Sequence, residues 1–406
     1  MMEIRRERPV TQIASTNSMI YERNYSLMTA ILFWCGLVVV SSVYLTIPLA
    51  DTFNEVFEAT AAQAAWTSSA FSLFYAIGCL FTAPLSDRYG RKRVILFGLA
   101  ALTIITGVLG LSNSLSTLIM LRSIQGIAAA TFPPVAVTYI VEMFPPEKRV
   151  TAIGFVSSGF LMAGVVGQIF SSFISNMFGW QSVFYMIGAI YLITTIIVAL
   201  LIPKADNQNN DNSLLAPFKQ FGSVLTIKPL LFCYIIATTL LLTFVGMYTA
   251  LGSYLSIEFG LGNQDIFFVR TVGIIGMLFS PFTGKLVAEF GIQNVLRGGL
   301  TLAFAGLAFL GISSNLPLLI IMSVMFVTGI AITVPTLISL VGQLGGQARG
   351  AAVSLYTSVV FIGASLGPIM AVALLNTSSY LLTFEILALL LGIGLVASFF
   401  IKPSIR

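Results

Sequence analysis

The chain has 406 residues, of which 57% are hydrophobic and only 9% are charged. Soluble domains have roughly 25% charged residues, so this chain cannot cover a water-facing surface and most of its outside must face lipid. It contains no histidine, which excludes imidazole as a base, proton relay or metal ligand, and its three cysteines fit neither a metal site nor a disulfide framework.

Twelve apolar segments follow one another along the chain, and each is long enough to span a bilayer. In the first half they cover about 27–49, 65–86, 94–111, 115–141, 150–176 and 181–202. In the second half they cover about 229–256, 266–288, 295–312, 315–342, 350–375 and 380–402. Apolar residues run continuously instead of alternating, which argues against a transmembrane barrel. The sequence therefore predicts an all-α membrane protein with twelve transmembrane helices.

The net charge of +5 comes from cations placed in every second gap between these segments and in the terminal segments. Arg122 and Arg270 are the exceptions, and the opposite gaps hold carboxylates such as Asp51 and Glu258 instead. This placement argues against nucleic-acid binding. By the positive-inside rule, it puts both termini in the cytoplasm of a multi-pass membrane protein.

The chain divides into two halves around its longest polar stretch. We expect a cytoplasmic N-terminal segment over 1–24, a six-helix bundle over 25–203, a cytoplasmic central loop over 204–228, and a second six-helix bundle over 229–403. The central loop contains a polar run, Asp206 to Asn212, that predicts flexibility.

A faint internal repeat relates the two halves. The stretch 83–90 and the stretch 284–291 share a leucine and a final glycine in register, namely Leu85 with Leu286 and Gly90 with Gly291. Two parallel repeats of six helices are typical of secondary transporters, whose substrate lies near the membrane midplane between the repeats.

Small residues recur at matching places in the fifth and eleventh segments. The fifth contains Gly159, Gly164 and Gly167, and the eleventh contains Gly363 and Gly367, followed by Pro368. Small residues let helix backbones approach closely, and proline bends a helix. We expect these positions to serve helix packing that permits rocking, with ordinary packing glycines as the alternative.

Two motifs resemble those of the major facilitator superfamily. Its loop signature G-x-L-x-D-R-x-G-R-K is matched here by Leu85, Asp87, Arg88, Gly90, Arg91 and Lys92, with Ala83 in place of the first glycine. Its helix-four signature R-x-x-Q-G is matched by residues 122–126. The antiporter signature of helix five is matched only in part, by Gly159 and Gly167. The chain most resembles the bacterial twelve-helix drug:H⁺ antiporter group, which implies two pseudo-symmetric bundles in the cell membrane and a monomer.

The loop between the second and third segments is the expected gate. Gly90 permits a tight reversal of the chain. The resemblance implies that Asp87 meets the positive N-terminus of the eleventh helix and holds the cytoplasmic side closed in an outward-facing state. Arg88 and Arg91 belong to the same loop, and Glu142 is placed to pair with Arg91. The alternative is that these cations only set the topology.

Arg122 lies about two turns into the fourth segment, where a guanidinium needs a polar cavity or a partner. The resemblance implies a role in proton coupling, with a purely structural arginine as the alternative. Glu385 is the second coupling candidate, unless it is merely interfacial. Arg270 lies near the outer end of the eighth segment.

The expected substrate cavity lies at the midplane between the halves. Aromatic residues at that depth are its candidates, and they would suit an amphipathic or weakly polar solute, although each is alternatively a packing residue. They are Tyr44, Phe71, Tyr75, Phe132, Tyr139, Phe155, Tyr248 and Tyr356.

The leading hypothesis is a secondary transporter that exports a small molecule by alternating access in exchange for protons. A facilitative or proton-coupled uptake carrier for a metabolite is the first alternative, because the first half has no carboxylate within helices one to three, five or six. A membrane sensor or scaffold is the remote one. An enzyme is not expected, nor a cofactor or metal. The chain contains no G-x-x-x-x-G-K-[ST] phosphate loop, so ATP is not expected as the direct energy source.

Overall fold

The structure is a computed structural model that describes residues 24–204, 216–312, 315–377 and 379–401. This part of the chain is helical, without a strand, and twelve of its helical segments are long and apolar enough to cross a membrane. The helices of the first half are α1 (Tyr25–Tyr44), α2 (Ala50–Val56), α3 (Ala61–Tyr89), α4 (Arg91–Leu109), α5 (Leu115–Ala129), α6 (Pro133–Met143), α7 (Pro146–Phe178) and α8 (Trp180–Leu201). Those that follow are α9 (Ala216–Leu225), α10 (Lys228–Phe259), α11 (Asn263–Met277), η1 (Ser280–Phe282), α12 (Thr283–Phe290), α13 (Ile292–Ile312), α14 (Leu316–Leu344), η2 (Gly346–Ala348), α15 (Arg349–Thr377) and α16 (Tyr380–Phe399).

Two spans that the sequence predicts as single helices are broken by proline. The fourth span divides into α5 and α6 just before Pro133 and Pro134. The eighth span divides into α11, η1 and α12 around Pro281. Proline lacks the backbone N–H that would continue the ladder of hydrogen bonds, and its ring clashes with the preceding turn. The expected continuous helices 115–141 and 266–288 are therefore corrected to broken ones.

Two short helices lie outside the predicted spans. The helix α2 follows the first span, and α9 occupies the last part of the central loop, where the sequence predicted only a polar connection. The run Asp206 to Asn212 and most of the N-terminal segment lie outside the described residues.

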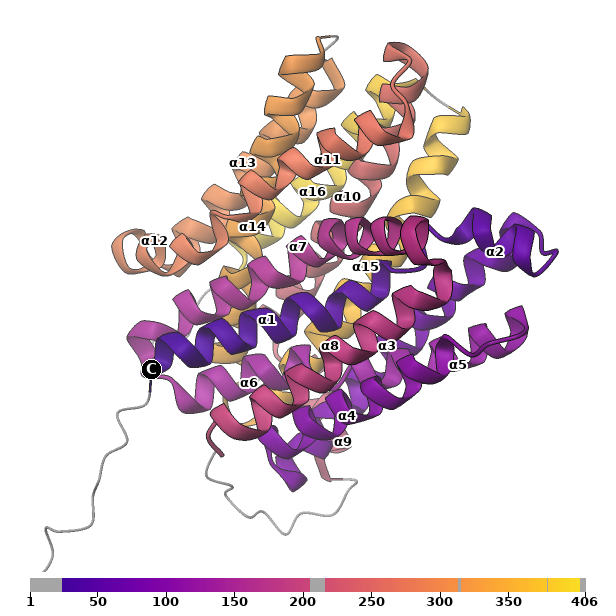
Figure 1. Cartoon of the computed structure of the whole chain (residues 1–406). Coiled ribbons are helices and arrows are strands. Elements are labelled where there is room, and N and C mark those ends of the chain that lie inside the picture. The colour runs from indigo at the N-terminus through magenta and orange to yellow at the C-terminus, as the bar shows by residue number, and fades with distance from the viewer. Residues whose placement is uncertain (1–23, 205–215, 313–314, 378, 402–406) are drawn as a thin grey trace, which may run out of the picture.

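Packing partners repeat in the two halves of the chain. In the first half α1 packs on α7, α3 on α5, and α4 on α8. In the second half the equivalent pairs are α10 with α15, α11 with α14, and α13 with α16. Counted as spans, both halves therefore pair the first helix with the fifth, the second with the fourth, and the third with the sixth. This is the architecture of two related six-helix bundles (Figure 1).

The glycines of the fifth and eleventh spans lie where these central helix pairs touch. A Cβ on Gly159 would lie 2.8 Å from the Phe33 carbonyl oxygen of α1, and one on Gly167 would lie 2.8 Å from the Ser41 carbonyl oxygen. On α15, a Cβ on Gly363 or on Gly367 would lie 2.5 Å from a backbone carbonyl oxygen of α10. Backbone-to-backbone contact therefore requires a residue without a side chain at these four positions.

Two other predicted packing residues have looser surroundings. The position of Gly164 has only ordinary contact with the Tyr44 ring, at 3.5 Å. Pro368 lies inside α15, which continues through it.

Twelve spans bring the start of α1 and the end of α16 to one face of the molecule, here called the terminal face, and the opposite one is the distal face. Figure 1 shows α2 at the distal end and α12 at the terminal end. Residues 350–358 of α15 are buried except for Leu355, whereas only Gly363, Gly367 and Ala371 are buried among residues 361–376. The helix α6 is buried except for Glu142. The two bundles are thus packed together towards the terminal face and separate towards the distal face.

Two hydrogen bonds join the bundles in the described part of the chain. Ser280 Oγ donates to the Gly154 carbonyl oxygen at 2.8 Å, and Ser358 Oγ donates to the Ala76 carbonyl oxygen at 3.0 Å. A Cβ on Gly154 would overlap the Ser280 carbonyl oxygen, so α7 and η1 meet backbone to backbone.

Candidate functional site

A cavity of about 70 Å³ lies between the two bundles, large enough for a few water molecules. Hydroxyl groups are its only polar side-chain groups, and no charged side chain lines it. The first bundle contributes Val40, Tyr44, Tyr75, Pro133, Val137, Phe160 and Leu161, and the second contributes Leu241, Phe244, Val334, Ile338, Val353, Tyr356, Thr357, Val360, Phe361 and Ala364. Both halves therefore supply walls to one mostly apolar chamber.

Three of the predicted cavity residues, Tyr44, Tyr75 and Tyr356, line this chamber. The hydroxyl oxygens of Tyr75 and Tyr356 are buried and have no hydrogen-bond partner in the described part of the chain. The ring centroid of Tyr75 lies 4.2 Å from that of Phe361, across the boundary between the bundles. These tyrosines give the chamber hydroxyl groups that a polar atom of a bound solute can satisfy.

The other predicted aromatic residues lie elsewhere. Phe71 packs beneath Arg122, and Phe132 packs edge-on against Phe160 outside the chamber lining. The Tyr139 hydroxyl donates to the Pro203 carbonyl oxygen at 2.8 Å, inside the first bundle.

Phe155 and Tyr248 also lie outside the chamber lining. Phe155 is 42% exposed and lines a different cavity, of about 510 Å³, between α1, α7 and the segment around η1. Tyr248 lies one turn beyond the chamber on α10, beside Arg270. Depth along a helix can be estimated from sequence, but the direction in which each residue points cannot. For this reason Phe160, Phe244 and Phe361, which do line the chamber, were missed.

Arg122 is fully buried inside the first bundle and does not line the chamber. Its Nε donates to the Thr67 carbonyl oxygen at 3.0 Å, Nη1 to Gln125 Oε1 at 2.7 Å, and Nη2 to Thr46 Oγ1 at 3.4 Å. The guanidinium carbon also lies 4.3 Å from the centre of the Phe71 ring. All these partners are neutral, and no carboxylate pairs with Arg122 in the described part of the chain.

A second layer of polar groups orients the acceptors around Arg122. Gln125 Nε2 donates to Thr106 Oγ1 at 2.7 Å, and the hydroxyls of Thr46 and Ser68 lie 2.7 Å apart. These contacts connect α3, α4, α5 and the chain after α1 through one buried cation. The R-x-x-Q-G motif is thus explained locally, because its arginine and its glutamine bond to each other one turn apart.

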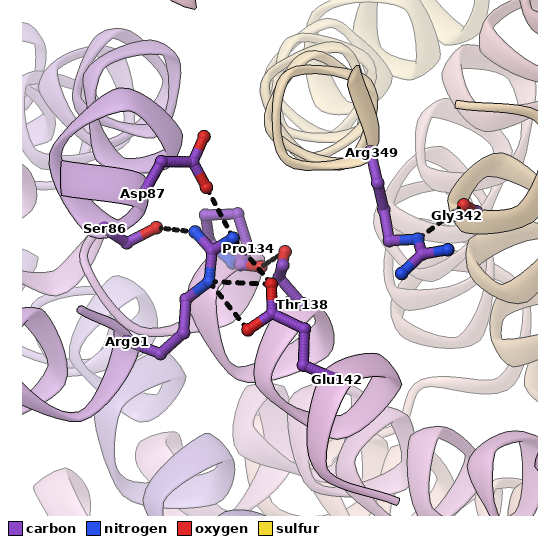
Figure 2. A network of polar contacts seen from close by, with 8 residues as sticks. All are labelled: Ser86, Asp87, Arg91, Pro134, Thr138, Glu142, Gly342 and Arg349. Carbon is purple, nitrogen blue, oxygen red and sulfur yellow. Dashed lines mark hydrogen bonds and ion pairs between the residues drawn. The ribbon is translucent and has the colours of Figure 1, made fainter. Parts of the chain in front are cut away.

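The predicted gate residues form a cluster at the terminal face, where Gly90 has a φ of +91° between α3 and α4. Arg91 donates from Nη2 to Glu142 Oε1 at 2.8 Å and from Nε to both carboxylate oxygens, at 3.3 and 3.2 Å. It also bonds the Ser86 hydroxyl and forms an ion pair with Asp87, as Figure 2 shows. The predicted pairing of Glu142 with Arg91 is present.

Asp87 does not reach the start of the eleventh span. Its carboxylate pairs with Arg91, which lies four residues further along, across the turn at Gly90 and at the start of α4. Asp87 makes no hydrogen bond to α15 in the described part of the chain. A full positive charge attracts a carboxylate more strongly than the partial charge of a helix end does. Arg349, at the start of α15, instead donates to the Gly342 carbonyl oxygen at 2.9 Å (Figure 2). The expected contact between Asp87 and the eleventh helix is therefore corrected.

The remaining charged candidates lie outside this cluster. Arg88 is exposed, with its guanidinium 5.5 Å from the centre of the Tyr89 ring. Glu385 lies near the distal start of α16, partly exposed beside Gly311, with neither hydrogen bond nor ion pair in the described part of the chain. Burial raises the pKa of Asp87 above its ordinary value, and Arg91 opposes this effect. In the residues that the structure describes, no group of three or more metal-ligating side chains comes together.

Comparison with known proteins agrees with this architecture. Residues 32–368 match the model of the Major Facilitator Superfamily. A protein of Buchnera aphidicola named as an uncharacterised transporter is 28% identical over 82% of this chain and 81% of its own. The multidrug resistance protein MdtG of Proteus mirabilis is 26% identical over 62% of this chain and 64% of its own.

A solved structure, that of the human organic anion transporter MFSD10, superposes with a TM-score of 0.76 at 16% identity, over 92% of this chain and 99% of that one. The chain therefore belongs to the Major Facilitator Superfamily of membrane transporters.

Proposed function

We propose that the protein exports a small amphipathic molecule across the cell membrane of a bacterium in exchange for protons, with the terminal face in the cytoplasm. The observation that carries the proposal is the chamber between the bundles, because both halves line it while they close it from one face only. A rocking motion that separated the terminal ends and joined the distal ends would expose the same chamber to the other side.

Three further observations support the finer parts of the proposal. Every lysine and arginine except Arg122 and Arg270 lies in the terminal segments or on the terminal side of the predicted spans, which favours a cytoplasmic terminal face. The chamber is mostly apolar, which suits an amphipathic solute. One relative carries the name of a multidrug resistance protein, which favours efflux.

The gate and the coupling element have separate places in this proposal. Arg91, Asp87 and Glu142 hold the terminal ends of α3, α4 and α6 in one arrangement, which steadies the first bundle while its end packs on the second. Arg122 couples proton movement to rocking from inside the first bundle, where a change of its partners would shift α3 against α5. Glu385 is the candidate carboxylate for the proton itself.

Uptake or facilitated diffusion is the second candidate function. The observation that favours it is the set of neutral partners around Arg122, since no carboxylate in the described residues pairs with this cation to receive a proton. A carrier that needs no proton would tolerate this arrangement.

A transport assay in proteoliposomes separates the two functions. Vesicles containing an internal pH-sensitive dye are loaded with candidate amphipathic solutes, and proton movement is recorded as each solute leaves. The exporter is expected to move protons inwards only when a transported solute is present. Solute movement without any proton movement would favour the facilitated carrier and contradict proton exchange.

A further inference from the structure

We propose that the distal part of the transport pathway recognises a negatively charged group on the substrate, through the guanidinium of Arg270 and the hydroxyl of Tyr248. The inference rests on the proposed transport function and names its substrate class, an amphipathic organic anion. It begins from two side chains that the chamber description leaves unexplained.

Tyr248 and Arg270 lie directly beyond the chamber on its distal side. Leu241 and Phe244 of α10 line the chamber, and Tyr248 and Gly252 continue the same spacing of three and four residues along the helix. Residues with this spacing share one helix face. The surface that lines the chamber therefore continues outwards past Tyr248 to Gly252, where the Arg270 side chain arrives from α11.

Arg270 reaches across to α10 and not along its own helix. Its Nη2 donates to the Tyr248 carbonyl oxygen at 3.1 Å, and α10 and α11 both pack on α14. Glycines make room for the two side chains. A Cβ on Gly252 would lie 2.5 Å from Arg270 Nη2, and one on Gly273 would overlap the Tyr248 hydroxyl. Gly252 of α10 therefore lies against the Arg270 side chain, and Gly273 of α11 lies against the Tyr248 side chain.

Two groups of the site that can donate hydrogen bonds are left unused. Arg270 Nε and the Tyr248 hydroxyl are buried and have no hydrogen-bond partner in the described part of the chain. The backbone carbonyl of Tyr248 is the only acceptor that Arg270 bonds there. A carboxylate, sulfonate or phosphate group would supply the missing oxygens, because a guanidinium binds such groups with two parallel hydrogen bonds.

The charge of Arg270 is also uncompensated. The carboxylates nearest to it in the sequence, Asp265 and Glu258, are exposed near the distal helix ends and form no ion pair with it in the described residues. Glu385 belongs to α16, beside Gly311 of α13. Arg270 is half-buried, and a cation held partly away from water without a counter-ion is costly in a membrane. An anionic substrate would lower that cost, and a cationic one would raise it.

The test uses two dyes with the same fused-ring skeleton and opposite charge, fluorescein as the anion and rhodamine 123 as the cation. Binding of each to the purified protein in detergent is measured by fluorescence polarisation. We expect saturable fluorescein binding that rhodamine 123 does not compete with. Arg270→Gln should weaken fluorescein binding at least tenfold, Arg270→Lys less, and Tyr248→Phe by a few-fold, since each change removes donors.

Arg297→Gln is the matched control. Arg297 Nε is likewise buried without a partner in the described part of the chain, but this residue lies on α13 with its guanidinium over the Phe399 ring. Its substitution should leave fluorescein binding unchanged. Arg270→Lys, which keeps the charge, guards against a variant that merely fails to fold, as does the melting temperature of each protein.

Three results would overturn the inference: no saturable fluorescein binding, equal binding of rhodamine 123, or unchanged fluorescein binding in Arg270→Gln. The proposed exchange with protons is judged separately, in vesicles. Fluorescein binding that depends on Arg270, combined with no proton movement in vesicles, would contradict the exporter and support the anion site.

Discussion

Two buried arginines of the first bundle show how differently one residue type can be accommodated. Arg91 is surrounded by two carboxylates and a hydroxyl at the terminal face, so its charge is balanced and its donors are used. Arg122 has only neutral acceptors and an aromatic face, so its charge is solvated but not balanced. A cation that is paired with carboxylates, such as Arg91, suits a structural role. A cation that has only neutral partners, such as Arg122, suits a site that responds to a change of charge nearby.

Arg122→Lys tests whether the fork shape of the guanidinium matters. Three nitrogens of Arg122 bond three different acceptors, and one ammonium cannot reach all of them from one point. Losing even one hydrogen bond to a charged group costs roughly 1.5–3 kcal/mol. We expect transport in proteoliposomes to fall about tenfold or more. Arg297→Lys is the control, and full activity in Arg122→Lys would assign the residue to packing alone.

Glu142→Gln should lower the melting temperature of the detergent-purified protein more than Asp87→Asn does. Glu142 accepts three hydrogen bonds from Arg91, and replacing a charged acceptor by an amide weakens each of them. Because Glu142 is partly exposed to water, we expect a loss of about 1 kcal/mol. Asp87 contributes less, since its burial already disfavours the charged form. Equal melting temperatures for the two variants would show that Glu142 does not stabilise the protein more than Asp87 does.

The raised pKa of Asp87 predicts how pH shifts the conformation of the protein. Opening the terminal face to water should bring this pKa down towards its ordinary value, so opening releases a proton. Low pH therefore favours the closed terminal face. The preference for the closed face is fully present below the ordinary pKa of an aspartate. It is lost as the pH rises through the raised pKa that Asp87 has in the closed structure.

The pH effect can be measured by the labelling rate of a cysteine at position 141, because Val141 is buried and faces Gly342 across the bundles. The three native cysteines are buried, which keeps background labelling low. Asp87→Asn, carrying the same reporter, corrects for the pH dependence of the labelling chemistry. A ratio between the two proteins that stays constant with pH would refute the linkage.

At the scale of helices, hydropathy and charge were sufficient to predict twelve spans, and the repeated residues in 83–90 and 284–291 indicated two related halves. The same patterns could not reveal the breaks before Pro133 and around Pro281, because proline both bends and interrupts helices and only packing decides which. Nor could they give the direction of each aromatic side chain. Phe155 and Phe160 both lie on α7, yet Phe160 faces the chamber and Phe155 lines the other cavity.

The contact between α7 and η1 gives a prediction about an element. A Cβ at position 154 would overlap the Ser280 carbonyl oxygen, which cannot move without displacing η1. Gly154→Ala should therefore open the terminal face and raise the labelling of a cysteine at position 141 several-fold. Gly107→Ala is the matched control, because a Cβ at position 107 meets no atom within 4 Å. Equal labelling in both variants would show that this close contact does not hold the face closed.

At the scale of the molecule, two similar bundles meet at one face and part at the other around a shared chamber. Equivalent helix pairs with glycine contacts build each bundle, so each can move as a unit while the surface between them rearranges. In the proposed transport by alternating access, the described structure is the conformation closed at the terminal face. The central claim is that a second conformation exists with the faces exchanged.

Distances between spin labels test that claim most directly, measured by electron paramagnetic resonance in lipid. One pair joins exposed positions 93 and 289 across the terminal face, and the other joins exposed positions 114 and 264 across the distal face. As pH or a transported solute is varied, we predict that the first distance lengthens while the second shortens in the same molecules. Distances that stay fixed, or that change in the same direction, would contradict transport by alternating access.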